Sequence, residues 1–125
     1  MNGSYLGPAF SQQDIQERLT RADAKFTILD DDALIADAAQ AMADAKAVGW
    51  FQGRMEFGPR ALGARSILAS PRRGDINKSL NDRLGRSEFM PFAPVVSEED
   101  SRPVFHVPSV NAYACRFMTL TLGVQ

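Results

Sequence analysis

The run of residues 53–63 restricts the fold of this chain more than any other feature. Its sequence is GRMEFGPRALG, with three glycines and a proline in eleven positions. Such a content is incompatible with regular helix or strand throughout, so we predict a shaped loop. Residues 47–51 before it and 65–70 after it have the short, apolar character of strands, and we predict a strand on each side of the loop.

Three other segments have helical patterns. Ser11 followed by Asp14 is typical of a helix start, and we expect this helix to end near residue 22. Residues 34–46 are rich in alanine and carry apolar residues at helical spacing, which favours a helix packed closely on a sheet. Asp75 is expected to cap a third helix.

Strand patterns also occur at residues 25–29, 89–96 and 115–122, the second of them irregular because it contains two prolines. Helices and strands that alternate without a regular βαβ rhythm favour a mixed α/β fold over a doubly wound sheet. The length of 125 residues is the usual size of one domain, so we predict a single domain over residues 1–125.

Charge is distributed unevenly along the chain. The formal net charge is only -1, which argues against a strong pull toward nucleic acid or a membrane surface. Residues 54–86, however, hold eight basic residues against three acidic ones. This segregation indicates that the middle third of the chain faces an anion.

The composition argues against several classes of protein. A single cysteine, Cys115, cannot form an internal disulfide, and only one histidine, His106, accompanies it, so we predict no metal site. A packing role is the expected one for both side chains. The chain shows neither a secretory leader nor an apolar run of membrane-spanning length, and we expect a cytoplasmic protein with no membrane partner.

The loop supplies the residues for an anion site. Gly53-Arg54, Gly58-Pro59-Arg60 and Gly63-Ala64-Arg65 place three arginines beside three glycines. A guanidinium offers phosphate a fixed fork of donors, and glycine lets backbone N–H groups come close. The spacing matches neither a Walker loop nor a dinucleotide fingerprint. The alternative is a glycine-rich turn whose arginines face water or pair with Glu56.

Two long blocks carry a resemblance to a known family. Residues 49–72, GWFQGRMEFGPRALGARSILASPR, and residues 80–96, LNDRLGRSEFMPFAPVV, resemble the signature blocks of the C-terminal domain of carbamoyltransferases of the NodU and O-carbamoyltransferase family. The early run YLGPAFSQQDIQERL is similar to the beginning of that domain. The resemblance therefore extends over almost the whole chain.

The resemblance implies a YrdC-like fold, with a mixed sheet packed with helices, and a carbamoyltransferase activity. In the family, carbamoyl phosphate and ATP are converted to a carbamoyl-adenylate. A separate N-terminal, Kae1-like domain, which binds iron or another metal, then moves the carbamoyl group to a hydroxyl. We expect this chain to be a fragment without that domain, to be inactive alone, and to begin at a Met1 that is not the native start.

Roles for individual residues follow from the resemblance and from phosphate electrostatics. The expected catalytic cations are Arg54, Arg60 and Arg65. The expected substrate and nucleotide contacts are Ser66, Arg83, Arg86, Phe57, Gly58 and Gly63. Mg²⁺ is expected to accompany ATP. The expected partners are carbamoyl phosphate, ATP and the N-terminal domain, with a homodimer left open and nucleic acid disfavoured.

Several alternatives stay open at this point. Glu56 either orients Arg54 or Arg60 or takes part in chemistry, and Phe57 either stacks on adenine or belongs to the core. Met90 stands where many family members have an arginine, which Arg83 or Arg86 could replace. The alternatives to an enzyme domain are a nucleic-acid-binding module, recognised by steep salt dependence, and a non-catalytic scaffold. The acceptor molecule cannot be deduced from these residues.

Overall fold

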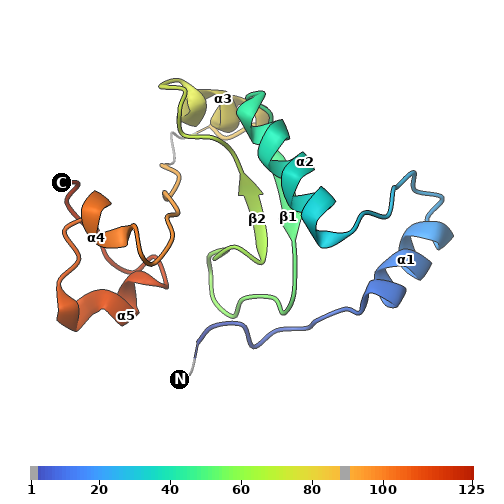
Figure 1. Ribbon diagram of the computed structural model, residues 1–125, viewed down its shortest axis with the longest axis horizontal. Helices are drawn as coiled ribbons and strands as arrows, with labels where there is room; N and C mark the ends of the chain where they lie inside the picture. Colours follow the sequence, from blue (N-terminus) through green and yellow to red (C-terminus); the bar gives the residue numbers. More distant parts are fainter. Residues whose placement is uncertain (1–2, 88–90) are drawn as a thin grey trace. The chain divides into compact units, whose positions relative to one another are not determined.

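The computed structural model describes residues 3–87 and 91–125, which form two compact units, Met1–Ser70 and Pro71–Gln125 (Figure 1). The first unit contains α1 (Gln12–Arg21), α2 (Asp31–Ala43), β1 (Val48–Phe51) and β2 (Arg65–Leu68). The second contains α3 (Ile76–Arg83), α4 (Ser101–Val104), the 3-10 helix η1 (Ser109–Asn111) and α5 (Ala112–Cys115). The predicted mixed α/β class is confirmed, whereas the single domain stays a prediction.

The two strands of the first unit form an antiparallel hairpin. Val48 pairs with Leu68 at one end and Phe51 with Arg65 at the other. The Gln52 N–H continues the ladder by donating to the Ala64 carbonyl at 3.0 Å, so the connecting loop begins and ends at the same point of the sheet. Both flanking strands and the predicted loop are therefore confirmed.

The two predicted N-terminal helices are also present. α1 begins with a complete capping box, because the Ser11 hydroxyl accepts from the Asp14 N–H and the Asp14 carboxylate accepts from the Ser11 N–H. α2 begins with Asp30, whose carboxylate accepts from the Ala33 N–H at 2.8 Å. It ends at Ala43, three residues earlier than predicted, because the chain turns there.

Three predicted strands are wrong for the described residues. Residues 25–29 are exposed and irregular, residues 91–96 are irregular, and residues 115–122 include the end of α5 and a turn. Residues 88–90, including Met90, lie outside the described residues. Apart from the β1–β2 pair, the described chain pairs strand-like residues only at the bridge between Phe105 and Val124. A strand-like sequence remains irregular where no neighbouring strand completes its hydrogen bonds.

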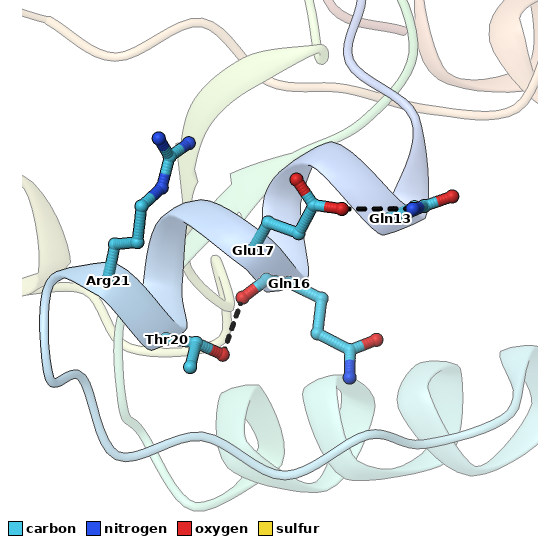
Figure 2. A pocket seen from close by; sticks show the side chains of 5 residues that line it. All are labelled: Gln13, Gln16, Glu17, Thr20 and Arg21. Atoms are coloured by element: carbon cyan, nitrogen blue, oxygen red, sulfur yellow. Dashed lines mark hydrogen bonds between the residues drawn. The ribbon is translucent and has the colours of Figure 1, made fainter.

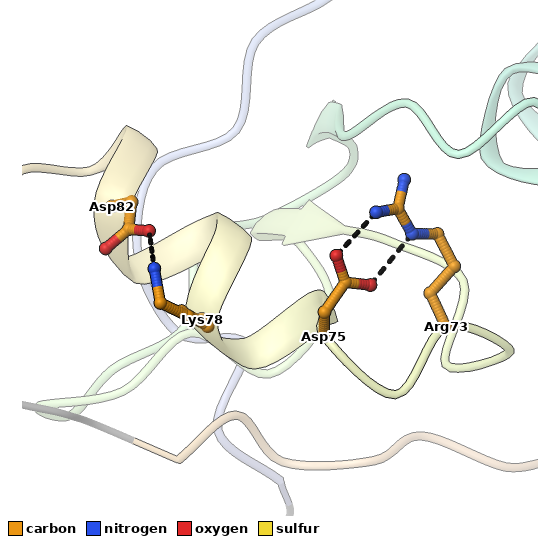
Figure 3. A network of polar contacts seen from close by, with 4 residues as sticks. All are labelled: Arg73, Asp75, Lys78 and Asp82. Atoms are coloured by element: carbon orange, nitrogen blue, oxygen red, sulfur yellow. Dashed lines mark hydrogen bonds and ion pairs between the residues drawn. The ribbon is translucent and has the colours of Figure 1, made fainter.

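The second unit has its own pattern of local charge pairs. The Arg73 guanidinium donates to the Asp75 carboxylate, and the Lys78 ammonium donates to the Asp82 carboxylate at 2.7 Å (Figure 3). Asp75 precedes α3 as predicted, but its carboxylate makes no capping hydrogen bond because it binds Arg73 instead. Leu80 is the buried apolar residue of this helix.

An N-terminal segment, residues 4–8, lies along the loop and holds it by backbone hydrogen bonds. The Gly7 N–H donates to the Met55 carbonyl at 2.9 Å, and the Met55 N–H donates to the Pro8 carbonyl at the same distance. The Phe57 N–H donates to the carbonyl of Ser4, which is buried. This segment therefore gives the first half of the loop a partner that resembles a third strand.

We predict that Gly7→Ala loosens this segment. A Cβ at residue 7 would lie 2.9 Å from both the Cβ and the carbonyl oxygen of Met55, and backbone must move to relieve this contact. The free energy of unfolding should fall by roughly 1–3 kcal/mol, measured by urea denaturation. The matched control is Gly49→Ala, where a Cβ meets no atom within 4 Å. Equal stabilities of the two variants would contradict the prediction.

Candidate functional site

The loop between β1 and β2 carries the candidate site. Two of its glycines are required by backbone geometry, because φ is 135° at Gly58 and 108° at Gly63, values that side chains other than hydrogen rarely allow. Both were predicted to contact the ligand. That contact stays a prediction, and the structure shows that both glycines turn the chain, one on either side of Arg60.

Arg65 fixes the base of the loop. Its guanidinium donates to the carbonyl oxygens of Gln52 at 2.8 Å, Ala64 at 2.8 Å and Gly53 at 3.1 Å. The same group lies 3.4 Å from the centroid of the Phe51 ring, its partner across the hairpin. Carbonyl contacts together with a cation–π contact bind this side chain to the loop's own backbone.

The other two arginines of the loop differ from each other. The Arg54 guanidinium donates to the Leu6 carbonyl at 3.0 Å and so fastens the loop to the N-terminal segment. Arg60 is exposed, and its side chain has no interaction partner in the described part of the chain. Of the three predicted catalytic cations, Arg60 is therefore the one whose guanidinium is fully available to a ligand.

Glu56 lies inside the loop and is only 5% exposed. Its Oε1 accepts from the N–H groups of Leu62 at 2.7 Å, Ala64 at 2.6 Å and Arg65 at 3.2 Å. Within the described residues it forms no ion pair with Arg54 or Arg60. The carboxylate thus binds backbone donors of the second half of the loop, which is the role that the sequence did not reveal.

The surroundings of Glu56 favour its charged form. Burial by itself would raise the pKa of this carboxyl, but hydrogen bonds from backbone N–H groups, that of Leu62 foremost, outweigh burial and hold the pKa below the ordinary value of 4.5. Its neighbour Ser66, a predicted ligand contact, accepts from the Gly63 N–H at 2.9 Å. Every N–H from residue 62 to residue 65 is therefore bound within the loop.

Phe57 and the two arginines of the second unit complete the predicted set. Phe57 is 69% exposed, so it is not a core residue, and its ring is accessible to a flat ligand. Arg83, at the end of α3, is exposed and has no partner among the residues that the structure describes. The Arg86 guanidinium lies 5.1 Å from the centroid of the Phe92 ring. A joint site of these two arginines with the loop stays a prediction.

Two hollows of the surface lie elsewhere. One is lined by Gln13, Gln16, Glu17, Thr20 and Arg21, all on α1, with a hydrogen bond from Gln13 to Glu17 across it (Figure 2). The other surrounds Phe105 and His106 in the second unit. Neither hollow includes an arginine of the loop. These two hollows therefore do not coincide with the candidate site.

No three His, Cys, Asp or Glu side chains come together as a metal-binding group in residues 3–87 and 91–125. None of the helices described has the length and the apolar character needed to cross a membrane.

The only carboxylate of the loop, Glu56, already binds backbone N–H groups. The residues of the loop therefore do not fit a site that holds Mg²⁺ by protein ligands alone.

We predict that Arg65→Lys destabilises the protein and that Arg60→Lys does not. An ammonium cannot reproduce the fork that binds the carbonyls of Gln52 and Gly53, so the free energy of unfolding should fall by about 1–3 kcal/mol. Arg60 contributes no such contact, and its variant should stay within about 0.5 kcal/mol of wild type. Chemical denaturation of both variants checks this prediction. An Arg65→Lys variant with the same free energy of unfolding as wild type would contradict it.

The lowered pKa of Glu56 predicts a pH dependence with a definite sign. A carboxyl whose pKa is depressed in the folded state contributes stability that is complete above 4.5 and is lost as the pH falls through the folded-state pKa. The stability difference between wild type and Glu56→Gln should therefore be constant near neutral pH and shrink in acid. Glu17→Gln on exposed α1 is the control, and a difference that grows in acid would contradict this sign.

Comparisons with known proteins show the family of the chain. The family described as "Carbamoyltransferase C-terminus" matches residues 39–125, which include the whole loop. The chain is 40% identical over 116 residues to the uncharacterized protein sll1178 of Synechocystis sp. (strain ATCC 27184 / PCC 6803 / Kazusa), covering 90% of this chain and 19% of that protein.

Two further relatives have functional names. The nodulation protein NolNO of Sinorhizobium fredii (strain NBRC 101917 / NGR234) is 41% identical over 106 residues, covering 83% of this chain and 16% of that protein. The 3'-hydroxymethylcephem-O-carbamoyltransferase of Amycolatopsis lactamdurans is 42% identical over 77 residues, covering 62% and 15%. The chain thus spans less than a fifth of these relatives' length. It belongs to the carbamoyltransferase C-terminal family.

Proposed function

We propose that this chain performs the activation half of an O-carbamoyl transfer, in which carbamoyl phosphate and ATP give a carbamoyl-adenylate. The main support for the proposal is that Arg60 is exposed and has no partner among the described residues. It lies between the turns at Gly58 and Gly63, in a loop held by hydrogen bonds. The loop lies within the family match. A relative in Amycolatopsis lactamdurans is named as an O-carbamoyltransferase, which supports the reaction class.

The chemistry explains why such a cation is needed. Water first hydrolyses carbamoyl phosphate, breaking its bond to phosphate and giving carbamate and inorganic phosphate. A carbamate oxygen then attacks the α-phosphorus of ATP, and the bond from that phosphorus to the pyrophosphate oxygen breaks, so that pyrophosphate leaves. Two anions are brought together and negative charge grows on the leaving group, so a fixed guanidinium lowers the barrier. Mg²⁺ would enter with the phosphate oxygens of the nucleotide, and we assign it no residue of this chain.

The loop arginines divide this work in the proposal. Arg60 meets the phosphates, whereas Arg54 and Arg65 hold the backbone that presents it. Arg83 and Arg86 would add charge from the second unit, the Ser66 hydroxyl would add a donor, and the exposed Phe57 ring would stack on the adenine. The acceptor is a hydroxyl compound, and its carbamoylation requires a metal-binding domain of the Kae1-like type.

The proposal predicts that Arg60→Ala weakens binding of ATP in the presence of Mg²⁺. Loss of charge-assisted hydrogen bonds of about 1.5–3 kcal/mol corresponds to a roughly 10–100-fold weaker affinity, measured by isothermal titration calorimetry. Arg73→Ala is the matched control, because Arg73 is occupied by Asp75. When the chain is assayed together with the N-terminal domain, release of pyrophosphate from ATP should also require carbamoyl phosphate.

Two outcomes would contradict this proposal. Equal ATP affinities of wild type and Arg60→Ala would remove Arg60 from the site. Pyrophosphate release in the presence of the N-terminal domain that is as fast with Arg60→Ala as with wild type would instead favour a scaffold role for the loop.

A further inference from the structure

We infer that Glu56 is a positioning residue. Its carboxylate occupies the backbone N–H donors of the loop, so that substrate phosphate binds at Arg60 and not at these donors. These donors are the N–H groups of Leu62, Ala64 and Arg65, here called the amide cluster. The second part of the inference rests on the proposed function. The first part concerns the loop alone and can be tested without any substrate.

The amide cluster has the geometry of an anion site. Its three N–H groups converge on one oxygen, Oε1 of Glu56, at 2.7, 2.6 and 3.2 Å. Convergent backbone N–H groups of a tight turn form the concave sites at which proteins bind phosphate and other anions. The glycine-rich sequence predicts that the backbone of this loop binds a phosphate in this manner. In the structure the same donors are occupied by a side chain of the chain itself.

Displacement of this side chain by a free phosphate is unfavourable. Glu56 is tethered six residues before Leu62, and a tethered group competes at a high effective concentration. It is also buried, so its removal would leave N–H groups without an acceptor at a substantial energetic cost. The amide cluster is therefore a structural site, and the exposed guanidinium of Arg60 is the remaining cationic group of the loop.

The position of Glu56 explains how it acts on Arg60. The first half of the loop, which contains Glu56, is hydrogen bonded to residues 4–8, and the second half contains the amide cluster. Glu56 joins these two halves, with Arg60 between them. Arg65 is held at both ends, since its N–H binds Glu56 while its guanidinium binds the Gln52 carbonyl. Loss of the carboxylate therefore frees the segment that carries Arg60.

Chemical rescue tests the inference. Glu56→Ala vacates the amide cluster, and acetate supplies a carboxylate that can refill it. We expect Glu56→Ala to melt at a lower temperature than wild type and to recover in a saturable manner with acetate, relative to chloride at equal ionic strength. Glu17→Ala, which removes an exposed carboxylate on α1, is the matched control and should not respond. An acetate response that is absent, or equal in the control, would overturn the inference.

A second measurement needs no variant and decides the matter if Glu56→Ala does not fold. In an acid titration followed by NMR, the amide proton shifts of Leu62, Ala64 and Arg65 should move together with one midpoint below 4.5, because one carboxylate binds all three. Gly63, whose N–H binds Ser66, should not share that transition as strongly. Unrelated midpoints within the amide cluster would contradict the assignment.

Ligand binding separates this inference from the proposed function. With ATP and Mg²⁺ as the probe, Glu56→Ala should bind about tenfold more weakly than wild type and should regain most of the affinity in acetate. Arg60→Ala should also bind more weakly, but acetate should not restore its affinity. Acetate rescue of melting without ATP binding in any variant would leave the role of Glu56 intact and sink the proposed function. ATP binding by Glu56→Ala as tight as that of wild type, without acetate, would leave the proposed function intact and contradict the role of Glu56 in positioning Arg60.

Discussion

One buried carboxylate organises the loop between β1 and β2, which carries the candidate site. Glu56 binds three N–H groups of the opposite half of its own loop through a single oxygen. Without the carboxylate, those N–H groups would have no acceptor, at a cost in free energy, because one of them belongs to the buried residue Ala64. The hairpin of β1 and β2 fixes where the loop begins and ends, and Glu56 fixes the path between.

The positive charge of the loop is consequently used in two ways. Arg54 and Arg65 bind carbonyl oxygens and act as structural cross-links, while Arg60 is exposed and free of partners among the described residues. This division suits the proposed site, in which one guanidinium of the loop binds the phosphate of a small molecule.

Much of this architecture could be predicted from the sequence, because the signals are local. The cluster of glycine and proline at residues 53–63 marked the loop, and Ser11 with Asp14 marked the start of α1. The strand expected at residues 25–29 failed because a β-prone sequence cannot say whether a neighbouring strand is present. Asp75 failed as a side-chain cap because Arg73, two residues away, competes for its carboxylate.

The loop that carries the candidate site was predictable, but the organisation of its side chains was not. From the sequence, Arg54, Arg60 and Arg65 have the same expected role, because nothing in their spacing indicates which guanidinium binds a carbonyl oxygen. Glu56 was missed as the central anion because its partners lie six to nine residues further along the chain, outside any local motif. A carboxylate followed by a glycine-rich run is the signal that could have indicated it.

We propose that Arg60, on a loop fixed by Glu56, binds the phosphates of the substrate. A crystal structure of the chain with a non-hydrolysable ATP analogue would test this proposal. We expect a phosphate oxygen within hydrogen-bonding distance of the Arg60 guanidinium while Glu56 still accepts from the N–H groups of Leu62 and Ala64. A phosphate bound to those amides in place of Glu56, or bound away from the loop altogether, would contradict it.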